Sequence, residues 1–103
     1  MMIRKRRTKQ LDFDALTMAA ECLKALAHPS RLQIVQNLMT GKRYSVNDLA
    51  AACNLSQPAT SDHLRLMQRC GFLTSERDGR TVYYEISEQH LHDIMACIQD
   101  RFG

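Results

Sequence analysis

The chain has 103 residues, of which 45% are hydrophobic, and this length suits one compact domain with a modest core rather than two. No apolar run approaches the roughly 20 residues that a membrane-spanning helix needs, and no apolar stretch follows the basic N-terminus as it would in a secretory signal. These features argue against a membrane protein and against wholesale disorder, and they predict a cytoplasmic location.

The net charge of +3 is distributed unevenly along the chain. Five basic residues precede the first acidic one, whereas the remaining sequence has nine Lys and Arg against eleven Asp and Glu. We therefore expect residues 1–11 to form a basic flexible tail and residues 12–103 to form the folded domain. Such tails often lie along phosphate backbones, although a solvated leader without a partner is the alternative. The five basic residues are Arg4, Lys5, Arg6, Arg7 and Lys9.

Two helices are predicted before the middle of the chain. Residues 13–27 carry apolar side chains at helical spacing, and Asp12 or Asp14 can cap the start of this helix. His28-Pro29 ends it, because the residue before a proline avoids the helical region. A second helix then opens at Pro29 or Ser30 and is followed by a short connector over residues 42–44. Its inward residues are expected to be Leu32, Val35, Leu38 and Met39.

The stretch from residue 45 to residue 71 predicts two short helices joined by a tight turn. The first spans about residues 46–53, and the second begins after Ser56, whose side-chain oxygen can accept from free backbone N–H groups. Pro58 is tolerated in the first turn, and Gly71 can adopt the left-handed conformation that ends the helix. The buried residues of the second helix are expected to be Leu64, Met67 and Cys70.

Short or planar polar side chains occupy the first two turns of this second helix. Hydroxyl and amide groups near a helix N-terminus are suited to base edges and phosphates in the DNA major groove. The alternative is that these groups only cap and solvate the helix. The set that we expect to face DNA comprises Gln57, Thr60, Ser61, His63 and Arg65.

After Gly71 the sequence pattern changes to the alternation of strands. Residues 72–77 and 81–86 are rich in β-branched and aromatic residues, and Asp78-Gly79 between them is a strong two-residue hairpin signal. A β-hairpin that follows a helix-turn-helix is a wing. Arg77 and Arg80 at its tip suit phosphate or minor-groove contacts, and a solvated turn with incidental arginines is the alternative.

A last helix is predicted over about residues 88–102. Its apolar stripe and that of the first helix flank the helix-turn-helix at both ends of the chain. We therefore expect these two stripes to form a dimer interface. Twofold symmetry would present two recognition helices to successive major grooves. The stripe consists of Leu91, Ile94, Met95, Ile98 and Phe102.

The four cysteines include no C-x-x-C pair, so a zinc-ribbon interpretation has no support. If the first and last helices pack together, Cys22 and Cys97 would approach each other as a candidate thiol switch for oxidants, reactive sulfur species or a soft metal. Buried packing as small hydrophobic residues is the alternative for each cysteine.

No arrangement of residues typical of an enzyme is present. Ser61 and His63 are two positions apart and point in different directions on a helix, so they form no nucleophile pair. The sequence therefore predicts no enzyme and no cofactor. A winged helix that binds proteins instead of DNA is a second interpretation, but it predicts an apolar or acidic recognition face, which the polar set described above disfavours.

The segments LKALAHPSRLQIVQNL and DLAAACNLSQPATSDHLRLMQRCGFLTSERDGRTVYYEI, with the closing helix, resemble the arsenic-repressor (ArsR/SmtB) family of bacterial winged-helix regulators. The likeness covers about residues 20–102. It implies a mainly α fold with a small β-hairpin wing (ααααββα) and a homodimer formed by the first and last helices. It also implies a repressor that binds double-stranded DNA at an inverted-repeat operator and releases it on meeting a small-molecule or redox inducer. The DNA-binding residues that follow are Ser56, Gln57, Thr60, Ser61, His63, Arg65, Arg77 and Arg80.

The chain departs from that family at both of its common metal sites. The thiolate site uses Cys-Val-Cys before Asp-Leu, where this chain has Ser45-Val46-Asn47. The site on the last helix could begin at Glu88-x-His90, but Arg101 stands where a later ligand is needed. We therefore expect no metal site, and His90 and His92 are interpreted as polar residues at a helix start.

Overall fold

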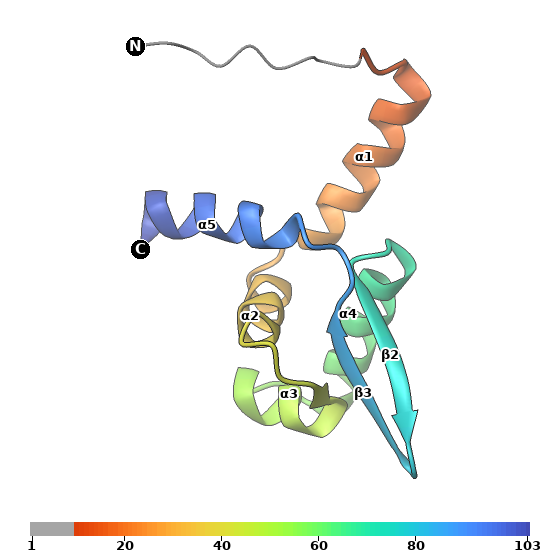
Figure 1. The fold of residues 1–103 in the computed structure, drawn as a ribbon, viewed down its shortest axis with the longest axis vertical. Helices are drawn as coiled ribbons and strands as arrows, with labels where there is room; N and C mark the ends of the chain where they lie inside the picture. Colours follow the sequence, from red (N-terminus) through yellow and green to blue (C-terminus); the bar gives the residue numbers. More distant parts are fainter. Residues whose placement is uncertain (1–9) are drawn as a thin grey trace.

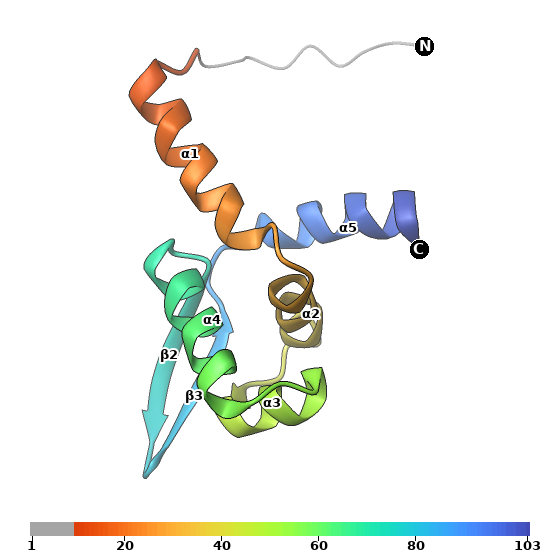
Figure 2. The same cartoon turned by 180° about the vertical axis from the view of Figure 1, so that it is seen from behind.

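The computed structural model describes residues 10–103 of the chain. Three helices and a small sheet form a body, and one further helix projects from it at each end of the described sequence (Figures 1 and 2). The order of elements confirms the predicted winged helix-turn-helix. The elements are α1 (Phe13–Leu26), α2 (Pro29–Leu38), β1 (Tyr44–Ser45), α3 (Val46–Cys53), α4 (Gln57–Arg69), β2 (Leu73–Asp78), β3 (Thr81–Ile86) and α5 (Leu91–Phe102).

The predictions of a basic tail, of no membrane-spanning helix and of a last helix from about residue 88 can each be compared with the described residues. The basic segment that contains Arg4, Lys5, Arg6, Arg7 and Lys9 lies outside the described residues. Within residues 10–103, every helix is too short or too polar to cross a membrane. The last helix begins at Leu91, later than expected, because residues 88–90 form a turn in which the Leu91 N–H donates to the Glu88 carbonyl.

Side chains cap the starts of the first helices. The Asp12 carboxylate accepts from the backbone N–H of the third residue of α1 at 2.8 Å, as predicted. His28 caps α2 through its Nδ1, which accepts from the Ser30 N–H at 3.1 Å. At α3, Ser45 and Asp48 form a reciprocal capping box, with bonds of 3.1 and 3.0 Å. These bonds satisfy N–H groups that have no partner within the helix, and they fix where each helix begins.

The sheet has three antiparallel strands in the order β1-β3-β2. Leu73 of β2 pairs with Ile86 of β3, while Tyr44 of β1 pairs with Tyr84 of β3. The sequence predicted only the hairpin and left residues 42–44 as a connector. A strand of two residues is too short to display alternation, so β1 is recognisable only through its distant partner.

The hairpin turn lies one residue later than predicted. Asp78 pairs with Thr81, so the two turn residues are Gly79 and Arg80 instead of Asp78 and Gly79. Gly79 has a φ of +66°, a conformation open to glycine because it has no Cβ. Glycine at the first turn position is typical of a hairpin turn of type II′, which matches the twist of the strands. Arg80 is thereby placed at the end of the wing.

The core lies between α2, α3 and α4, the base of the sheet and the start of α5. Ile34 is fully buried although the predicted inward face of α2 omitted it, and Leu32 and Met39 are only partly buried. Leu64 and Met67 are buried as predicted, whereas Cys70 is half-buried. The core cluster contains Leu26, Ile34, Val35, Leu38, Leu49, Cys53, Leu64, Met67, Leu73, Leu91 and Met95.

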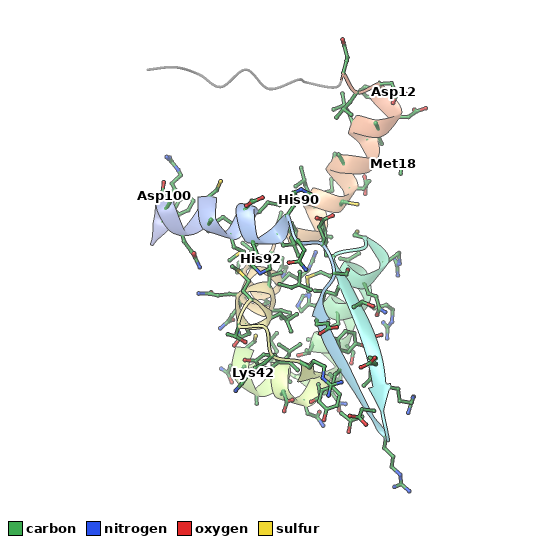
Figure 3. The ribbon with its side chains drawn as sticks, viewed as in Figure 1. Asp12, Met18, Lys42, His90, His92 and Asp100 are labelled. Carbon is green, nitrogen blue, oxygen red and sulfur yellow. The ribbon has the colours of Figure 1, made fainter. Side chains whose placement is uncertain are left out.

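Large apolar side chains on the projecting helices are left uncovered. Phe13 and Met18 on α1 are 79% and 70% exposed, and Phe102 on α5 is 75% exposed. Figure 3 shows Met18 and Asp100 on two helices that run away from each other beyond the body. Of the two stripes that the sequence assigned to a dimer interface, the single chain leaves Leu16 and Leu23 of α1 and Phe102 of α5 exposed. Leu91 and Met95 of the α5 stripe are instead buried in the core of the same chain.

Candidate nucleic-acid interface

The start of α4 is built by a sharp turn after α3. Asn54 adopts a left-handed conformation with a φ of +56° and ends α3, and the backbone then reaches Ser56. The Ser56 hydroxyl accepts from the Ala59 N–H at 3.2 Å, which confirms it as the cap of α4. Gln57 is the first helical residue and is exposed. The turn thus presents the N-terminus of α4 at the surface, where its N–H groups favour negative charge.

A groove of about 460 Å³ lies between this part of the molecule and the wing. Gln57 enters it from α4, Asn47 from α3, and Arg80 and Thr81 from the hairpin. Two predicted DNA-binding residues from distant elements, Gln57 and Arg80, therefore share one hollow. The full lining is Ser45, Val46, Asn47, Asp48, Gln57, Arg80, Thr81, Val82 and Tyr83.

The expectation that Thr60 faces outward is wrong. Its side chain is fully buried, and its hydroxyl donates to the Ser56 carbonyl at 2.8 Å within the same helix. Thr60 precedes Leu64 by four positions and Met67 by seven, so it continues the inner stripe of α4 toward the N-terminus. The spacing alone could have shown this, since the apolar stripe extends back to residue 60.

His63 is turned toward α2 and not outward with the other polar groups. Its Nδ1 accepts a hydrogen bond from Nε of Arg31 at 3.2 Å, and its ring centroid lies 4.8 Å from that of His28. Burial, followed by the nearby His28 and Arg31, lowers the pKa of His63 below its usual value, while Asp62 opposes this. The sequence motif His28-Pro29-Ser30-Arg31 contained both partners, but only the packing of α2 on α4 reveals the contact.

Two further residues of α4 lie where the sequence placed them or close to it. Arg65 is exposed and forms an ion pair with Asp62 at 3.0 Å, three positions earlier on the helix. Ser61 is half-buried and therefore has a smaller accessible surface than Gln57. The outward polar face of α4 is thus reduced to Gln57, Ser61 and Arg65.

Arg43 contacts three side chains of the wing, and the sequence did not predict these contacts. Its guanidinium lies 3.1 Å from Glu76 and 3.6 Å from Asp78, and it stacks over the ring of Tyr83 at 4.6 Å. Because strand residues alternate between faces, Arg77 projects from the opposite face of β2 to these two acids. Arg43 therefore offsets part of the negative charge on this face of the wing. It comes from the segment predicted as a connector, and only the strand pairing brings it there.

Lys42 and Arg43 border a second hollow, of about 680 Å³, beside α3. Figure 3 shows Lys42 beside α3, on the side of the body away from the β2–β3 hairpin. Arg77 and Arg80 are both exposed on the wing itself. Arg80 is thus the basic side chain in the lining of the groove, while Lys42 and Arg43 line the second hollow, which shares Asn47, Asp48 and Tyr83 with the groove. Positive charge at these positions favours an anionic ligand.

The cysteines are arranged differently from the predicted pair. Burial, and then the neighbouring Cys22 thiol, raise the pKa of the Cys70 thiol above its ordinary value, so Cys22 of α1 lies beside Cys70 at the end of α4. Cys97 is exposed on α5, which diverges from α1 (Figures 1 and 2). A raised pKa disfavours the reactive thiolate at Cys70. Within one chain Cys22 neighbours Cys70 instead of Cys97, and a thiol switch formed by Cys22 and Cys97 stays a prediction.

His90, just before α5, and His92, its second residue, contact residues two or three positions earlier in the chain. Nδ1 of His90 lies 2.6 Å from Oε2 of Glu88, whose pKa is lowered first by the His90 backbone N–H and then by the His90 ring. Nδ1 of His92 lies 3.2 Å from the Gln89 carbonyl. Figure 3 shows both histidines at the start of α5. These contacts agree with their interpretation as polar residues at a helix start.

Comparison with known proteins gives consistent matches in sequence. Residues 28–75 match the family described as "Bacterial regulatory protein, arsR family". The chain is 39% identical over 82 residues to the HTH-type transcriptional repressor SmtB of Mycobacterium tuberculosis. The aligned region covers 80% of this chain and 60% of SmtB. The chain is 36% identical over 92 residues to the HTH-type transcriptional regulator NmtR of the same organism, which covers 89% of this chain and 76% of NmtR. The chain thus spans about 60% of the length of SmtB.

The fold is also found in a solved structure. A homodimeric winged helix-turn-helix DNA-binding domain from Mycobacterium bovis, described as a possible ArsR-family transcriptional regulator, matches with a TM-score of 0.74 and 28% identity. The match covers 90% of this chain and 87% of that domain. Sequence and architecture agree, and the chain belongs to the ArsR family of bacterial regulatory proteins.

Proposed function

We propose that this chain is a DNA-binding transcriptional repressor that binds an inverted-repeat operator as a homodimer. The observation that carries the proposal is the shared groove, in which Gln57 at the start of α4 and Arg80 in the wing turn line the same hollow. This arrangement suits a DNA duplex, because the N-terminus of α4 can enter the major groove while the basic hairpin contacts the phosphate backbone.

The proposed contacts divide into base reading and phosphate binding. The Gln57 amide can pair with the edge of an adenine, and the Ser61 hydroxyl can reach a base or a neighbouring phosphate. Arg65, Arg77 and Arg80 supply positive charge to phosphates, and this contribution does not depend on sequence. Ser56 uses its oxygen lone pairs as the cap of α4, which leaves its O–H free to donate to a phosphate. Thr60 is not part of this interface because it is buried.

Dimerisation is supported by large apolar side chains that are exposed on α1 and at the end of α5. Burying a large apolar side chain contributes about 1.5–3 kcal/mol, so exposed Phe13, Met18 and Phe102 favour association with a second copy. The related domain from Mycobacterium bovis is homodimeric. A twofold dimer would place two α4 helices on successive major grooves, which is why we expect a palindromic operator.

We also infer that an inducer does not act through a thiolate metal site before α3. Ser45 and Asn47 stand at the two positions where thiolates would be needed. The Ser45 hydroxyl is engaged in the capping box with Asp48, which gives this side chain a structural task. A hydroxyl and an amide are poor substitutes for two thiolates on a soft metal.

The test is a titration of labelled DNA from upstream of the chain's own gene, with a scrambled duplex of equal length as the control. We expect Gln57→Ala to weaken operator binding about tenfold while changing binding to the scrambled duplex by less than about twofold. A matched control is Gln33→Ala, an exposed glutamine on α2 away from the groove. Equal affinity of the unmodified protein for both duplexes would contradict the proposed function.

A further inference from the structure

Arg31, in the first turn of α2, joins three helices through one guanidinium group. Its Nη1 donates to the carbonyl oxygens of Ala25 and Lys24 in the last turn of α1, at 2.9 and 3.3 Å. Its Nε donates to Nδ1 of His63 on α4, at 3.2 Å. The last carbonyls of a helix lack N–H partners in that helix, and a cation there is favoured by the helix dipole. Arg31 therefore bonds the end of α1 and the side of α4 at the same time.

These hydrogen bonds dictate the charge and the tautomer of His63. A guanidinium can only donate, so Nδ1 of His63 must accept, and the ring is neutral with its proton on Nε2. Nδ1 of His28 also accepts a hydrogen bond, from the Ser30 N–H at 3.1 Å. The two rings lie 4.8 Å apart and are tilted by 52°. A second proton on His63 would have to occupy Nδ1, where the Arg31 N–H already points.

The ionisable groups around His63 come from two sides. Across the contact between α2 and α4 it faces His28 and Arg31, and on its own helix it neighbours Asp62. Asp62 favours a proton on His63, but this carboxylate is exposed and already paired with Arg65 at 3.0 Å. The end of α1 contributes backbone carbonyls, which face Arg31. Protonation of His63 therefore replaces a hydrogen bond by repulsion from Arg31.

We propose that Arg31 is a positioning residue that holds α4 in a fixed orientation to α1, and that protonation of His63 breaks this hold and lowers operator affinity in acid. The inference rests on the proposed function, in which α4 reads DNA and α1 carries dimer contacts. The spacing between the two reading helices of a dimer depends on the angle between these helices in each chain. Protonation of His63 would thus change the spacing of the two reading helices and with it the fit of the dimer to both DNA half-sites.

The first test uses the full chain without DNA. Nitrogen and proton NMR of the histidine rings between pH 5 and 8 should show His63 with its proton on Nε2 and a titration midpoint below 6.5. In Arg31→Gln the midpoint should rise, because the cation is gone. A proton on Nδ1, or a midpoint that Arg31→Gln does not move, would overturn the inference.

The second test measures operator affinity against pH. His63→Asn places an amide oxygen where Nδ1 accepts from Arg31, and this group does not titrate between pH 5 and 8. The unmodified protein should lose affinity about tenfold between pH 7.5 and 5.5, whereas His63→Asn should stay within about twofold. His90→Asn, which removes an exposed histidine bonded within its own turn, should keep the unmodified profile. An equal pH dependence in His63→Asn would overturn the inference.

A third variant separates positioning from charge. Arg31→Lys keeps the cation but cannot span the α1 carbonyls and His63 with one ammonium group, so operator affinity at pH 7.5 should fall about tenfold. Arg69→Lys, at an exposed arginine in the last turn of α4, is the matched control and should change little. If Arg31→Lys does not fold, by circular dichroism, the pH profile of His63→Asn still decides the matter. Failure of the unmodified protein to prefer its operator would overturn the proposed function, whereas operator binding with an unchanged profile in His63→Asn overturns this inference alone.

Discussion

Gln57 and Arg80 line the same groove although one stands in the first turn of α4 and the other in the turn between β2 and β3. Pairing of Asp78 with Thr81 leaves Arg80 in the hairpin turn, and the Ser56 cap exposes Gln57 at the helix start. The two side chains differ in chemistry, since a planar amide can distinguish bases and a guanidinium in this position meets phosphates. Their substitution is therefore expected to affect DNA binding in different ways.

Arg80→Ala should weaken binding to operator and random DNA by similar factors. The loss of one phosphate contact should reduce the slope of log affinity against log salt by about one. The measurement is fluorescence anisotropy on both duplexes between 50 and 200 mM salt, a range of about fourfold. Arg69→Ala, with the same change in charge at the far end of α4, should leave the slope nearly unchanged. A loss confined to the operator would show that Arg80 reads bases.

Thr60→Val should leave the preference for the operator unchanged. The side chain is buried, and the Ser56 carbonyl that accepts from its hydroxyl also accepts from the Thr60 backbone N–H at 3.0 Å. Valine keeps the volume and loses one hydrogen bond, so the free energy of unfolding should change by no more than about 1 kcal/mol. Urea denaturation and the two-duplex titration measure both quantities. Relaxed operator preference with unchanged stability would place Thr60 in the interface after all.

Phe13→Ser combined with Met18→Ser should weaken self-association. Both side chains are largely exposed on α1, and removing two apolar groups of this size should raise the dimer dissociation constant by at least about tenfold. Sedimentation equilibrium over a range of protein concentrations gives the constant directly. The control is Gln33→Ser on exposed α2 surface. An unchanged dissociation constant would mean that the copies meet through another surface.

The free energy of unfolding should fall as the pH falls below about 6.5, the ordinary pKa of histidine. Because the pKa of His63 is lowered in the folded chain, the unfolded chain binds the proton first. The stability contributed by neutral His63 is therefore fully present above the unfolded pKa and is lost as the pH falls toward the folded one. Urea unfolding at fixed protein concentration between pH 7.5 and 5.5 checks this, and His63→Asn should show the smaller decrease. A decrease of equal size in both proteins would contradict the assignment to His63.

Local signals in the sequence determined most of the secondary structure. The caps at Asp12 and Ser56, the proline at the start of α2 and the left-handed Gly71 are local requirements, so the elements they delimit were predictable. The alternation after residue 71 predicted the wing for the same reason. The motif order carried the family resemblance, and with it the expectation of a DNA-binding regulator. Each of these signals depends on residues within a turn or two of one another.

Tertiary packing decided which polar side chains of α4 are available. Thr60 is buried and His63 is bonded to Arg31, so two of the expected DNA-facing residues have other partners. Contact between Arg43 and the acids of the wing likewise depends on how β1 pairs with β3.

The sequence by itself determined the order of the helices, the starts of α1, α2 and α4 and the presence of the hairpin, because capping, turn and periodicity signals act between neighbours along the chain. It did not predict β1, the start of α5 or the exact hairpin turn. Only the tertiary structure decided that Gln57 meets Arg80 across a groove and that Arg31 reaches both α1 and His63. Such contacts join residues far apart in sequence, and their geometry is set by helix and strand packing that no local pattern encodes.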